Sequence, residues 1–337
     1  MIPWKQVQPA QSFTLDLAVG SSSKFTMPPT PFLSRRNFII TTSTAVAATL
    51  TPFAQPPPAR RFDFIGFIKP FQKLTYAEIA DTSAEIGWHG IECPVRKGGT
   101  IEPPAVEEEL PKLVELLTKN KLELPVIATD AEDASDAVTQ RVLRTASKLG
   151  IRRYRMKHLY YDLEKSIAPQ LENFRAKLRD LARLNAELKI QGTIQNHSGK
   201  NYLGAPVWDM WEVIRQLDPK QLAAYFDIGH ATLEGGLSWP LHAKVIEPHL
   251  AVVSVKDFIW TKMYRPEERP ATKDKDPWKD EWCPLGQGMI QPAFFTWLKK
   301  TSFSGPISTH FEYPLGSGKA MIAAMKKDLE ILKEWLT

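Results

Sequence analysis

The feature of this sequence that most constrains its fold is a regular alternation of apolar runs with helical patterns. Eight runs have the length and composition of buried strands, and each precedes a segment whose apolar residues recur at helical spacing. The runs span residues 62–68, 88–94, 122–130, 152–157, 189–197, 223–230, 250–257 and 305–314. Eight strand–helix units within residues 62–337 match the count and size of a (β/α)8 TIM barrel, an α/β fold with a single domain. A doubly wound sheet is the alternative, but no glycine-rich phosphate turn follows the first run.

Helix signals between the runs support this division. Thr75 and Glu78 have the spacing of a capping box, which predicts that a helix begins at this point. The apolar spacing predicts further helices from about Pro103, over residues 167–188 and over residues 319–336, where the chain ends.

Residues 1–61 have the character of a leader rather than of a folded domain. Ser34–Ile40 (SRRNFII) contains a twin arginine followed by a weakly apolar run, which resembles a twin-arginine export signal. The run is short and threonine-rich for a membrane span, so we expect no stable membrane insertion after cleavage. We interpret residues 1–26 as an over-called start, 27–54 as the signal and 55–61 as a proline-rich spacer. The chain is therefore expected in the periplasm or otherwise exported.

The net charge of +5 argues little for nucleic acid, because the leader carries all of it. Residues 1–61 hold six basic residues and one acid, so residues 62–337 hold 37 of each sign and are neutral. Phosphate binding requires clustered cations, and we therefore expect no nucleic-acid partner. The two cysteines, Cys93 and Cys283, either form a disulfide or are free thiols. Their placement in different loops favours free thiols.

Polar residues gather where the apolar runs end. In chain order these residues are Glu92, Asp130, Lys157, His158, Gln195, Asn196, His197, Asp227, His230, Lys256, Asp257, His310 and Glu312. In a TIM barrel the chemistry lies at the C-terminal ends of the strands. A single buried histidine or aspartate is usually structural. Seven strand ends with carboxylates and imidazoles are more typical of metal ligation or general acid–base catalysis.

The motifs at these ends resemble one known group of proteins. FDIGH (226–230) followed by EGG, then VKD (255–257), PLGQG (284–288) and HFEYP (310–314) are similar to the sugar isomerase/epimerase superfamily of xylose isomerase-like barrels. The resemblance covers roughly residues 62–337. It implies a divalent cation (manganese, magnesium or zinc) held by acids and a histidine on strands five to eight, and proton transfer next to a carbonyl. Endonuclease IV is a distant member, but the neutral barrel and the export signal argue against DNA repair.

Two of the ligands implied by this resemblance match, and two differ. Asp227 and Glu312 stand at the acidic positions, whereas Gln195 replaces a glutamate and Ser254 replaces a histidine. An amide and a hydroxyl are weak ligands for a transition metal. We expect a degenerate metal site of Asp227, Glu312 and Gln195, with His197, His230 or His310 as substitute ligands.

Lys256 has two interpretations. It is either a structural cation paired with Asp257 or Glu312, or the positive charge that replaces the metal by polarising a substrate carbonyl. In the second interpretation Glu312 or Asp227 is the base. We assign catalysis to Glu312, Lys256, Asp257 and His230, and substrate binding to His197, Asn196, Glu92, Lys157, His310 and Trp260.

Two further segments bear on the ligand. About thirty residues, from Phe258 to Met289, separate the seventh run from its helix and carry Trp260, Trp278 and Trp282. Segments of this length are usually binding loops, and their tryptophans either stack on sugar rings or anchor the loop. Near the fourth run, Arg153 and Arg155 share one strand face and could meet a phosphate, whereas Arg152 cannot join them. A neutral sugar is the preferred ligand over a sugar phosphate.

These observations lead to one preferred function and two alternatives. We expect an exported sugar isomerase or epimerase that acts on a carbohydrate or polyol by abstracting a proton beside a carbonyl. A lyase or dehydratase acting on a keto-sugar shares this first step, and a non-catalytic carbohydrate-binding barrel is the second alternative. Barrels of the superfamily often associate through their outer helices, so a homo-oligomer is also expected.

Overall fold

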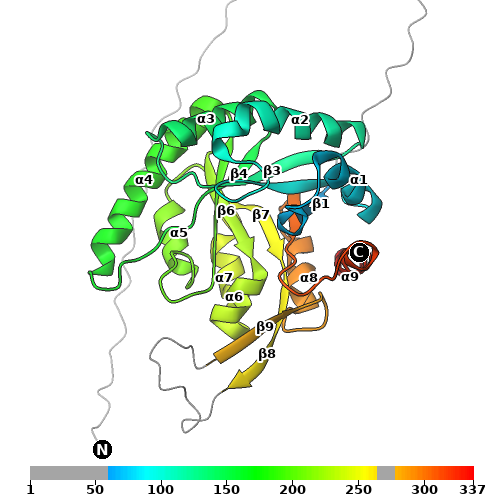
Figure 1. Ribbon diagram of the computed structural model, residues 1–337. Coiled ribbons are helices and arrows are strands. Elements are labelled where there is room, and N and C mark those ends of the chain that lie inside the picture. Colours follow the sequence, from blue (N-terminus) through cyan, green and yellow to red (C-terminus); the bar gives the residue numbers. More distant parts are fainter. Residues whose placement is uncertain (1–59, 264–277) are drawn as a thin grey trace, which may run out of the picture. The chain divides into compact units, whose positions relative to one another are not determined.

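The computed structural model describes residues 60–263 and 278–337, and these form a closed parallel barrel surrounded by helices (Figure 1). Around the barrel the strand order is β1-β10-β7-β6-β5-β4-β3-β2, with all neighbouring pairs parallel. The strands are β1 (Phe62–Phe67), β2 (Gly90–Val95), β3 (Glu123–Thr129), β4 (Arg153–Arg155), β5 (Gln191–Gln195), β6 (Leu222–Asp227), β7 (Leu250–Val255) and β10 (Gly305–Thr309). The predicted (β/α)8 TIM barrel is confirmed.

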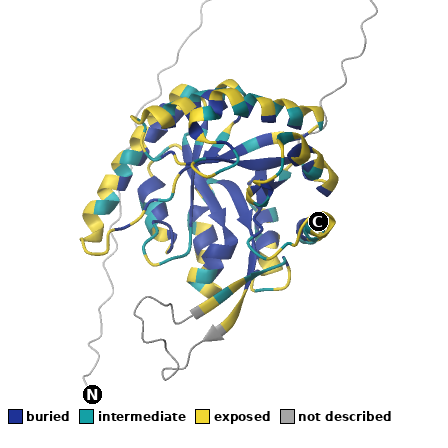
Figure 2. Ribbon diagram, in the orientation of Figure 1, coloured by how far each residue is buried: buried dark blue, intermediate teal, exposed yellow. Residues whose placement is uncertain are grey.

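The helices lie outside the barrel, and each buries one face against it. In Figure 2 the barrel strands are therefore mainly dark blue and the outer faces of the helices mainly yellow. They are α1 (Tyr76–Ile86), α2 (Val106–Lys119), α3 (Ala137–Lys148), α4 (Ile167–Leu188), α5 (Trp208–Ile214), α6 (Ile228–Gly235), α7 (Trp239–Ile246), α8 (Pro292–Lys300) and α9 (Lys319–Leu336). Four short 3-10 turns join them, at Lys69–Phe71, Pro103–Ala105, Gly236–Ser238 and Glu247–His249. The bounds of α4 and α9 agree with the sequence prediction. The capping box is also present, since the Thr75 side chain accepts from Glu78 N and the Glu78 side chain accepts from Thr75 N.

The apolar core has two parts. The larger part fills the space between the strands and the helices. The smaller part lies within the barrel and consists of Ile65, Val126, Ala223, Tyr225, Ala251 and Val252. Because side chains of successive strand residues alternate between the two faces, the inward residues form layers across the barrel. The smaller cluster therefore fills part of the barrel interior with apolar side chains.

The segment after β7 differs from the expected loop. Strands β8 (Asp257–Met263) and β9 (Trp278–Cys283) pair antiparallel and extend away from the barrel (Figure 1). The residues of the charged middle of this segment, 264–277, lie outside the described residues. A hairpin satisfies the backbone groups that an extended loop would leave to water.

Other sequence expectations can be compared with the described residues. Cys93 and Cys283 are both free thiols, as expected. Among the described helices, none combines the length and apolar character needed to cross a membrane. The leader assignments fall mainly on residues 1–59, which lie outside the described part of the chain.

Candidate functional site

The centre of the site is Asp227, the last residue of β6. Its Oδ2 accepts a hydrogen bond from Gln195 Nε2 at 2.9 Å and lies 3.2 Å from Lys256 Nζ. Its Oδ1 accepts from His230 N at 2.9 Å and so caps the N-terminus of α6. Burial would raise the pKa of Asp227, but the charge of Lys256 and the hydrogen bond from His230 N contribute to lowering it below its ordinary value. Asp227 is therefore a carboxylate at neutral pH.

Lys256 follows β7 and is buried beside Asp227. Its Nζ lies 2.6 Å from His230 Nε2 and 4.9 Å from the centroid of the Trp282 ring. Lys256 therefore pairs with Asp227. The predicted pairing with Asp257 or Glu312 is wrong. Gly229 permits this arrangement, because a Cβ there would lie 2.8 Å from Lys256 Cγ and 2.7 Å from Lys256 O. The glycine of the FDIGH motif thus makes room for the lysine side chain.

The His230 ring joins Lys256 to the loop after β5. Its Nδ1 is 2.8 Å from Ser198 Oγ. Because the ammonium of Lys256 donates to Nε2, the geometry assigns the ring proton to Nδ1, which donates to Ser198. Burial and the nearby charge of Lys256 lower the pKa of His230 well below its ordinary value, so the ring is neutral.

A second polar cluster lies inside the barrel around Glu92 of β2. Glu92 Oε2 accepts from Tyr225 Oη at 2.5 Å and from Ser308 Oγ at 2.7 Å, and it lies 3.1 Å from His310 Nε2. Glu92 Oε1 is 3.3 Å from Arg155 Nε. Burial would raise the pKa of Glu92, but the charge of Arg155 and the hydrogen bond from His310 lower it to about 2. Glu92 and His310, predicted to bind substrate, are thus brought together and are held by partners from three strands, β4, β6 and β10.

Gln195 connects the two clusters. Its Oε1 accepts from Arg155 Nη1 and its Nε2 donates to Asp227, so both ends of the amide are committed. The neighbouring Asn196 pairs with the backbone of Asp227, donating to its O at 2.9 Å and accepting from its N at 2.7 Å. Asn196 therefore positions Asp227, and this geometry provides no support for substrate binding by its amide.

Glu312 follows β10 and is half-buried at the edge of the site. Its Oε2 is 3.0 Å from Lys69 Nζ, which belongs to the turn after β1. Burial would raise the pKa of Glu312, but the charges of Lys256 and Lys69 lower it. Glu312 is a carboxylate with partial access to solvent, as a general base requires.

His197 lies against His230, with ring centroids 3.8 Å apart, and stacks on Tyr202 at 4.5 Å. The ring of His158 contacts both His197 and Tyr202. Burial, followed by the charge of Lys256, lowers the pKa of His197 to about 4. These neutral rings lie together beside His230, and substrate binding by His197 remains a prediction.

Three predicted residues have other partners. Asp257 accepts hydrogen bonds from the backbone N of Phe258, Gly286, Gly288 and Ile290, which is an anchoring role. Lys157 pairs with Glu132 in a partly exposed ion pair. Trp260 lies on β8 with 39% of its surface exposed and contacts Phe258. The geometry provides no support for catalysis by Asp257, and the roles of Lys157 and Trp260 remain predictions.

The donors at the expected metal position do not fit a divalent cation. Gln195 directs its oxygen at Arg155, and the ammonium of Lys256 lies against the Asp227 oxygen that a metal would need. Ser254 Oγ is buried, and none of the described residues hydrogen-bonds to it. Within residues 60–263 and 278–337, no three histidine, cysteine, aspartate or glutamate side chains are placed to hold a metal. The expectation of manganese, magnesium or zinc therefore lacks support in the donor set.

Sequence reasoning missed Tyr225, Ser198 and Lys69, which all contact residues named above. It named Arg155 only as a phosphate contact and Trp282 only as a tryptophan of the long segment, whereas both side chains contact the site. The two-residue alternation that placed Arg155 on one strand face was the available signal for it. Nothing local in the sequence marked Ser198 or Lys69, because their partners come from distant strands.

Comparison with known proteins places the fold of the chain in a recognised family. A family profile described as "Xylose isomerase-like TIM barrel" matches residues 80–335. No curated protein matches the sequence.

Three solved structures share the fold. A D-allulose 3-epimerase from Methylomonas sp. has a TM-score of 0.62 and 14% identity, covering 82% of this chain and 99% of its own. A probable 3-DHS dehydratase from Bacillus anthracis has a TM-score of 0.59 and 13% identity, and the match covers 80% of this chain and 98% of the dehydratase. A xylose isomerase-like TIM barrel protein from Mycobacterium smegmatis in complex with magnesium has a TM-score of 0.54 and 14% identity. The match covers 79% of this chain and 92% of that protein.

Proposed function

Because the chain belongs to the xylose isomerase-like TIM barrel family, we propose that its barrel binds a carbohydrate or polyol and abstracts a proton beside a carbonyl. The observation that carries the proposal is the buried ammonium of Lys256, held by Asp227 at 3.2 Å and His230 at 2.6 Å. It stands at the strand ends where TIM barrels do chemistry. Solved structures of the same fold include the D-allulose 3-epimerase, which supports the substrate class.

In the proposed reaction Lys256 acts as the electrophile. Its ammonium donates a hydrogen bond to the substrate carbonyl oxygen and stabilises the negative charge that develops there. Asp227 and neutral His230 hold it in place, since Asp227 Oδ2 lies 3.2 Å and His230 Nε2 2.6 Å from Nζ. A cation on a protein side chain thus supplies stabilisation without any metal-dependent step.

Glu312 is the proposed base. Its carboxylate takes the proton from the carbon beside the carbonyl, the C–H electron pair forms a C=C bond, and the carbonyl electrons move to oxygen. Return of the proton to the opposite face of the same carbon gives an epimer. Return to the former carbonyl carbon gives an isomer, provided that the hydroxyl proton of the enediolate passes to the former carbonyl oxygen and the neighbouring C–O becomes the new carbonyl. The low pKa of Glu312 keeps it able to accept a proton at neutral pH, and Lys69 orients it.

Elimination is the second candidate reaction. The same enediolate can expel a leaving group from the β carbon, which gives a lyase or dehydratase acting on a keto-sugar. The dehydratase among the structures of this fold favours keeping this candidate.

The test is solvent exchange. Keto-sugars are incubated with the protein in deuterated water, and the carbon-bound deuterium is followed by NMR. We expect deuterium beside the carbonyl of at least one sugar, with loss of exchange in Glu312→Gln and no change in the exposed control Lys319→Met. Exchange with a new product signal separates epimerisation from elimination. Saturable binding without any exchange would instead identify a carbohydrate-binding protein and refute the enzyme.

We also propose that the chain is exported through its twin-arginine signal, on the strength of SRRNFII and the apolar run after it. Mass spectrometry of the N-terminus of protein recovered outside the cytoplasm tests this, and an unprocessed cytoplasmic chain would contradict it. Association of copies through the outer helices remains part of the proposal, and light scattering of the purified protein tests it.

A further inference from the structure

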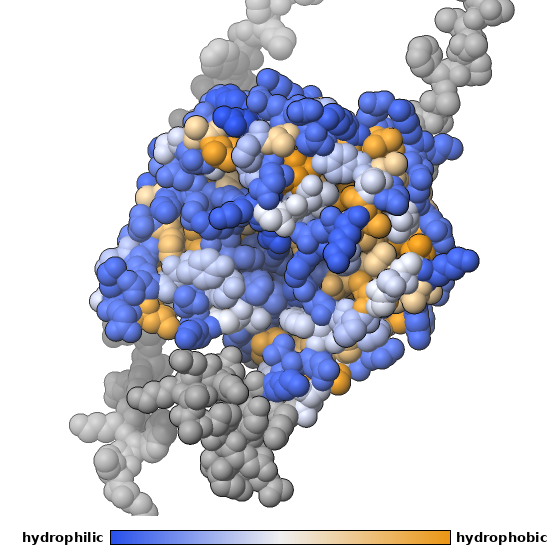
Figure 3. All heavy atoms as spheres, viewed as in Figure 1, coloured by the Kyte–Doolittle hydropathy of each residue, from blue (hydrophilic) through white to orange (hydrophobic). Residues whose placement is uncertain are grey.

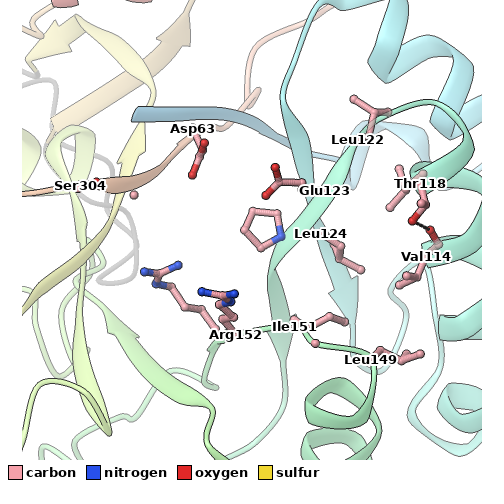
Figure 4. Close-up of a pocket in the computed structure, with 15 residues that line it drawn as sticks. Asp63, Val114, Thr118, Leu122, Glu123, Leu124, Leu149, Ile151, Arg152 and Ser304 are labelled. Atoms are coloured by element: carbon pink, nitrogen blue, oxygen red, sulfur yellow. Dashed lines mark hydrogen bonds between the residues drawn. The ribbon is translucent and has the colours of Figure 1, made fainter. Parts of the chain in front are cut away.

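The opposite end of the barrel contains hollows that the proposed reaction does not use. One of about 530 Å³ lies between the starts of β1, β3, β4 and β10, and its lining includes Asp63, Glu123, Arg152 and Arg153 (Figure 4). An adjoining one of about 390 Å³ shares both arginines. Since these residues begin their strands, the hollows face away from Lys256 and Glu312.

The two hollows differ in charge balance. In Figure 4 the carboxylates of Asp63 and Glu123 lie on one side and Arg152 on the other. Both carboxylates already have a counter-charge, because Arg60 is 3.2 Å from Asp63 Oδ1 and 2.9 Å from Glu123 Oε1. The smaller hollow is lined by four cations and no acid, namely Arg152, Arg153, Lys189 and Lys220, together with Ile190 and Gln191.

The guanidinium of Arg153 is held in a fixed position. Its Nε donates to Gln191 Oε1 at 2.9 Å, and Gln191 Nε2 donates in turn to Pro219 O at 2.6 Å. Its two Nη groups have no hydrogen-bond partner among the described residues, and the group is only partly exposed. Burial lowers the pKa of Arg153, the negative charge of Asp63 opposes this shift, and the positive charge of Arg152 adds to it.

The other three cations of the smaller hollow have no side-chain partner among the described residues. Within the described part of the chain, the side chains of Arg152, Lys189 and Lys220 form neither a hydrogen bond nor an ion pair. Lys189 has a φ of 55°, a left-handed conformation at the end of α4 that glycine adopts without strain. The lysine at this position adds a third cation beside Arg152 and Arg153.

We propose that Arg152, Arg153, Lys189 and Lys220 form a binding site for an oxyanion of the phosphate or sulfate class. An arginine fork suits such groups because its parallel N–H donors match two of their oxygens. The site is distinct from the sugar reaction and lies at the other end of the barrel.

A structural explanation competes with this proposal. Lys189 follows the C-terminus of α4, where a cation stabilises the helix dipole without binding any ligand. That explanation requires no ligand, so binding measurements separate the two.

The experiment is calorimetric titration of the full-length protein with inorganic pyrophosphate and with a heparin-derived sulfated disaccharide. We expect saturable binding of at least one probe. Tighter pyrophosphate binding would indicate a free phosphate compound, and tighter binding of the disaccharide would indicate an anionic polysaccharide. The double variant Arg152→Gln/Lys220→Gln should weaken binding at least tenfold and leave deuterium exchange into keto-sugars unchanged.

The matched control is Lys73→Gln/Lys319→Gln, which removes the same charge from exposed positions elsewhere. If both double variants bind the probes equally weakly, the effect is due to net charge, and the proposed oxyanion site is wrong. Absence of saturable binding to wild type would also overturn it. Because sugar exchange is measured separately, failure of this site and failure of the proposed reaction can be told apart.

Discussion

At the scale of single residues, the site is a balance of four buried charges. The carboxylates of Glu92 and Asp227 face the cations of Arg155 and Lys256, and Gln195 bridges the two pairs. Buried charges persist only when each has a partner, because desolvating an unpaired charge costs several kcal/mol. Each of these four charged side chains therefore has an oppositely charged partner before any substrate enters.

The first prediction concerns Lys256. Lys256→Met leaves Asp227 buried without a counter-ion, and we expect a loss of about 3–5 kcal/mol in the free energy of unfolding. Deuterium exchange should fall by about 100-fold, the usual effect of removing one oxyanion donor. The double variant Lys256→Met/Asp227→Asn should recover most of the stability but none of the exchange, as measured by urea unfolding and NMR. Full exchange in either variant would eliminate Lys256 as the electrophile.

The second prediction concerns pH and His197. Its pKa in the folded state is about 4, below the 6.5 of an unperturbed histidine. Below pH 6.5 the imidazole of His197 is protonated in the unfolded chain, whereas in the folded chain it stays neutral down to about pH 4. The free energy of unfolding therefore decreases as the pH falls from 6.5 to 4. His197→Asn should reduce this acid-induced loss by about 2 kcal/mol.

Urea unfolding of both proteins at pH 7.5 and pH 4.5 tests this. Other groups, including Asp328 with its raised pKa, titrate in the same range, but they are common to both proteins and cancel in the difference. The same acid-induced loss in wild type and variant would show that His197 does not contribute.

At the scale of elements, Asp257 connects the β8–β9 hairpin to the barrel. Its Oδ2 accepts from Gly286 N and Gly288 N at 3.0 Å, and its Oδ1 accepts from Ile290 N at 3.0 Å. The loop approaches so closely that a Cβ on Gly288 would lie 2.4 Å from Asp257 Oδ1. One carboxylate thus organises the backbone between β9 and α8.

The third prediction follows from this contact. Asp257→Ala removes acceptors from four backbone donors, and we expect about 3 kcal/mol of lost stability together with faster proteolysis within residues 284–291. The control is Asp280→Ala in β9, whose carboxylate forms no hydrogen bond with the described residues. Urea unfolding and mapping of the cleavage sites by mass spectrometry test it. An Asp257→Ala protein that resists protease as well as the control would exclude the anchoring role.

At the scale of the whole molecule, the barrel has the fold of its family, and cationic side chains lie among the polar groups at its strand ends. Seven strand ends carry polar groups, and the buried cations among them are Arg155 and Lys256. Figure 3 shows hydrophilic residues over most of the visible face, with apolar ones scattered among them. This surface suits a polar ligand better than an apolar one.

The fourth prediction concerns metal. Protein purified without chelator should contain no stoichiometric manganese, magnesium or zinc by mass spectrometry, and chelator should leave deuterium exchange unchanged. The triple variant Gln195→Glu/Ser254→His/Lys256→Met supplies two new ligands and removes the competing ammonium, so it should bind manganese in calorimetry. Stoichiometric metal in the wild-type protein would show that the donor argument is wrong.

The sequence by itself determined the barrel, the bounds of α4 and α9, and the gathering of polar residues at one end of the strands. These depend on local periodicity, helix-end signals and the parallel direction of the strands, all of which are readable along the chain. Only the tertiary structure decided which charges meet. Lys256 pairs with Asp227 rather than with its neighbour Asp257 because β6 and β7 align Asp227 with Ser254, two residues before the lysine. Such partners depend on register around a closed barrel, and no local pattern encodes a distance between residues that far apart in the chain.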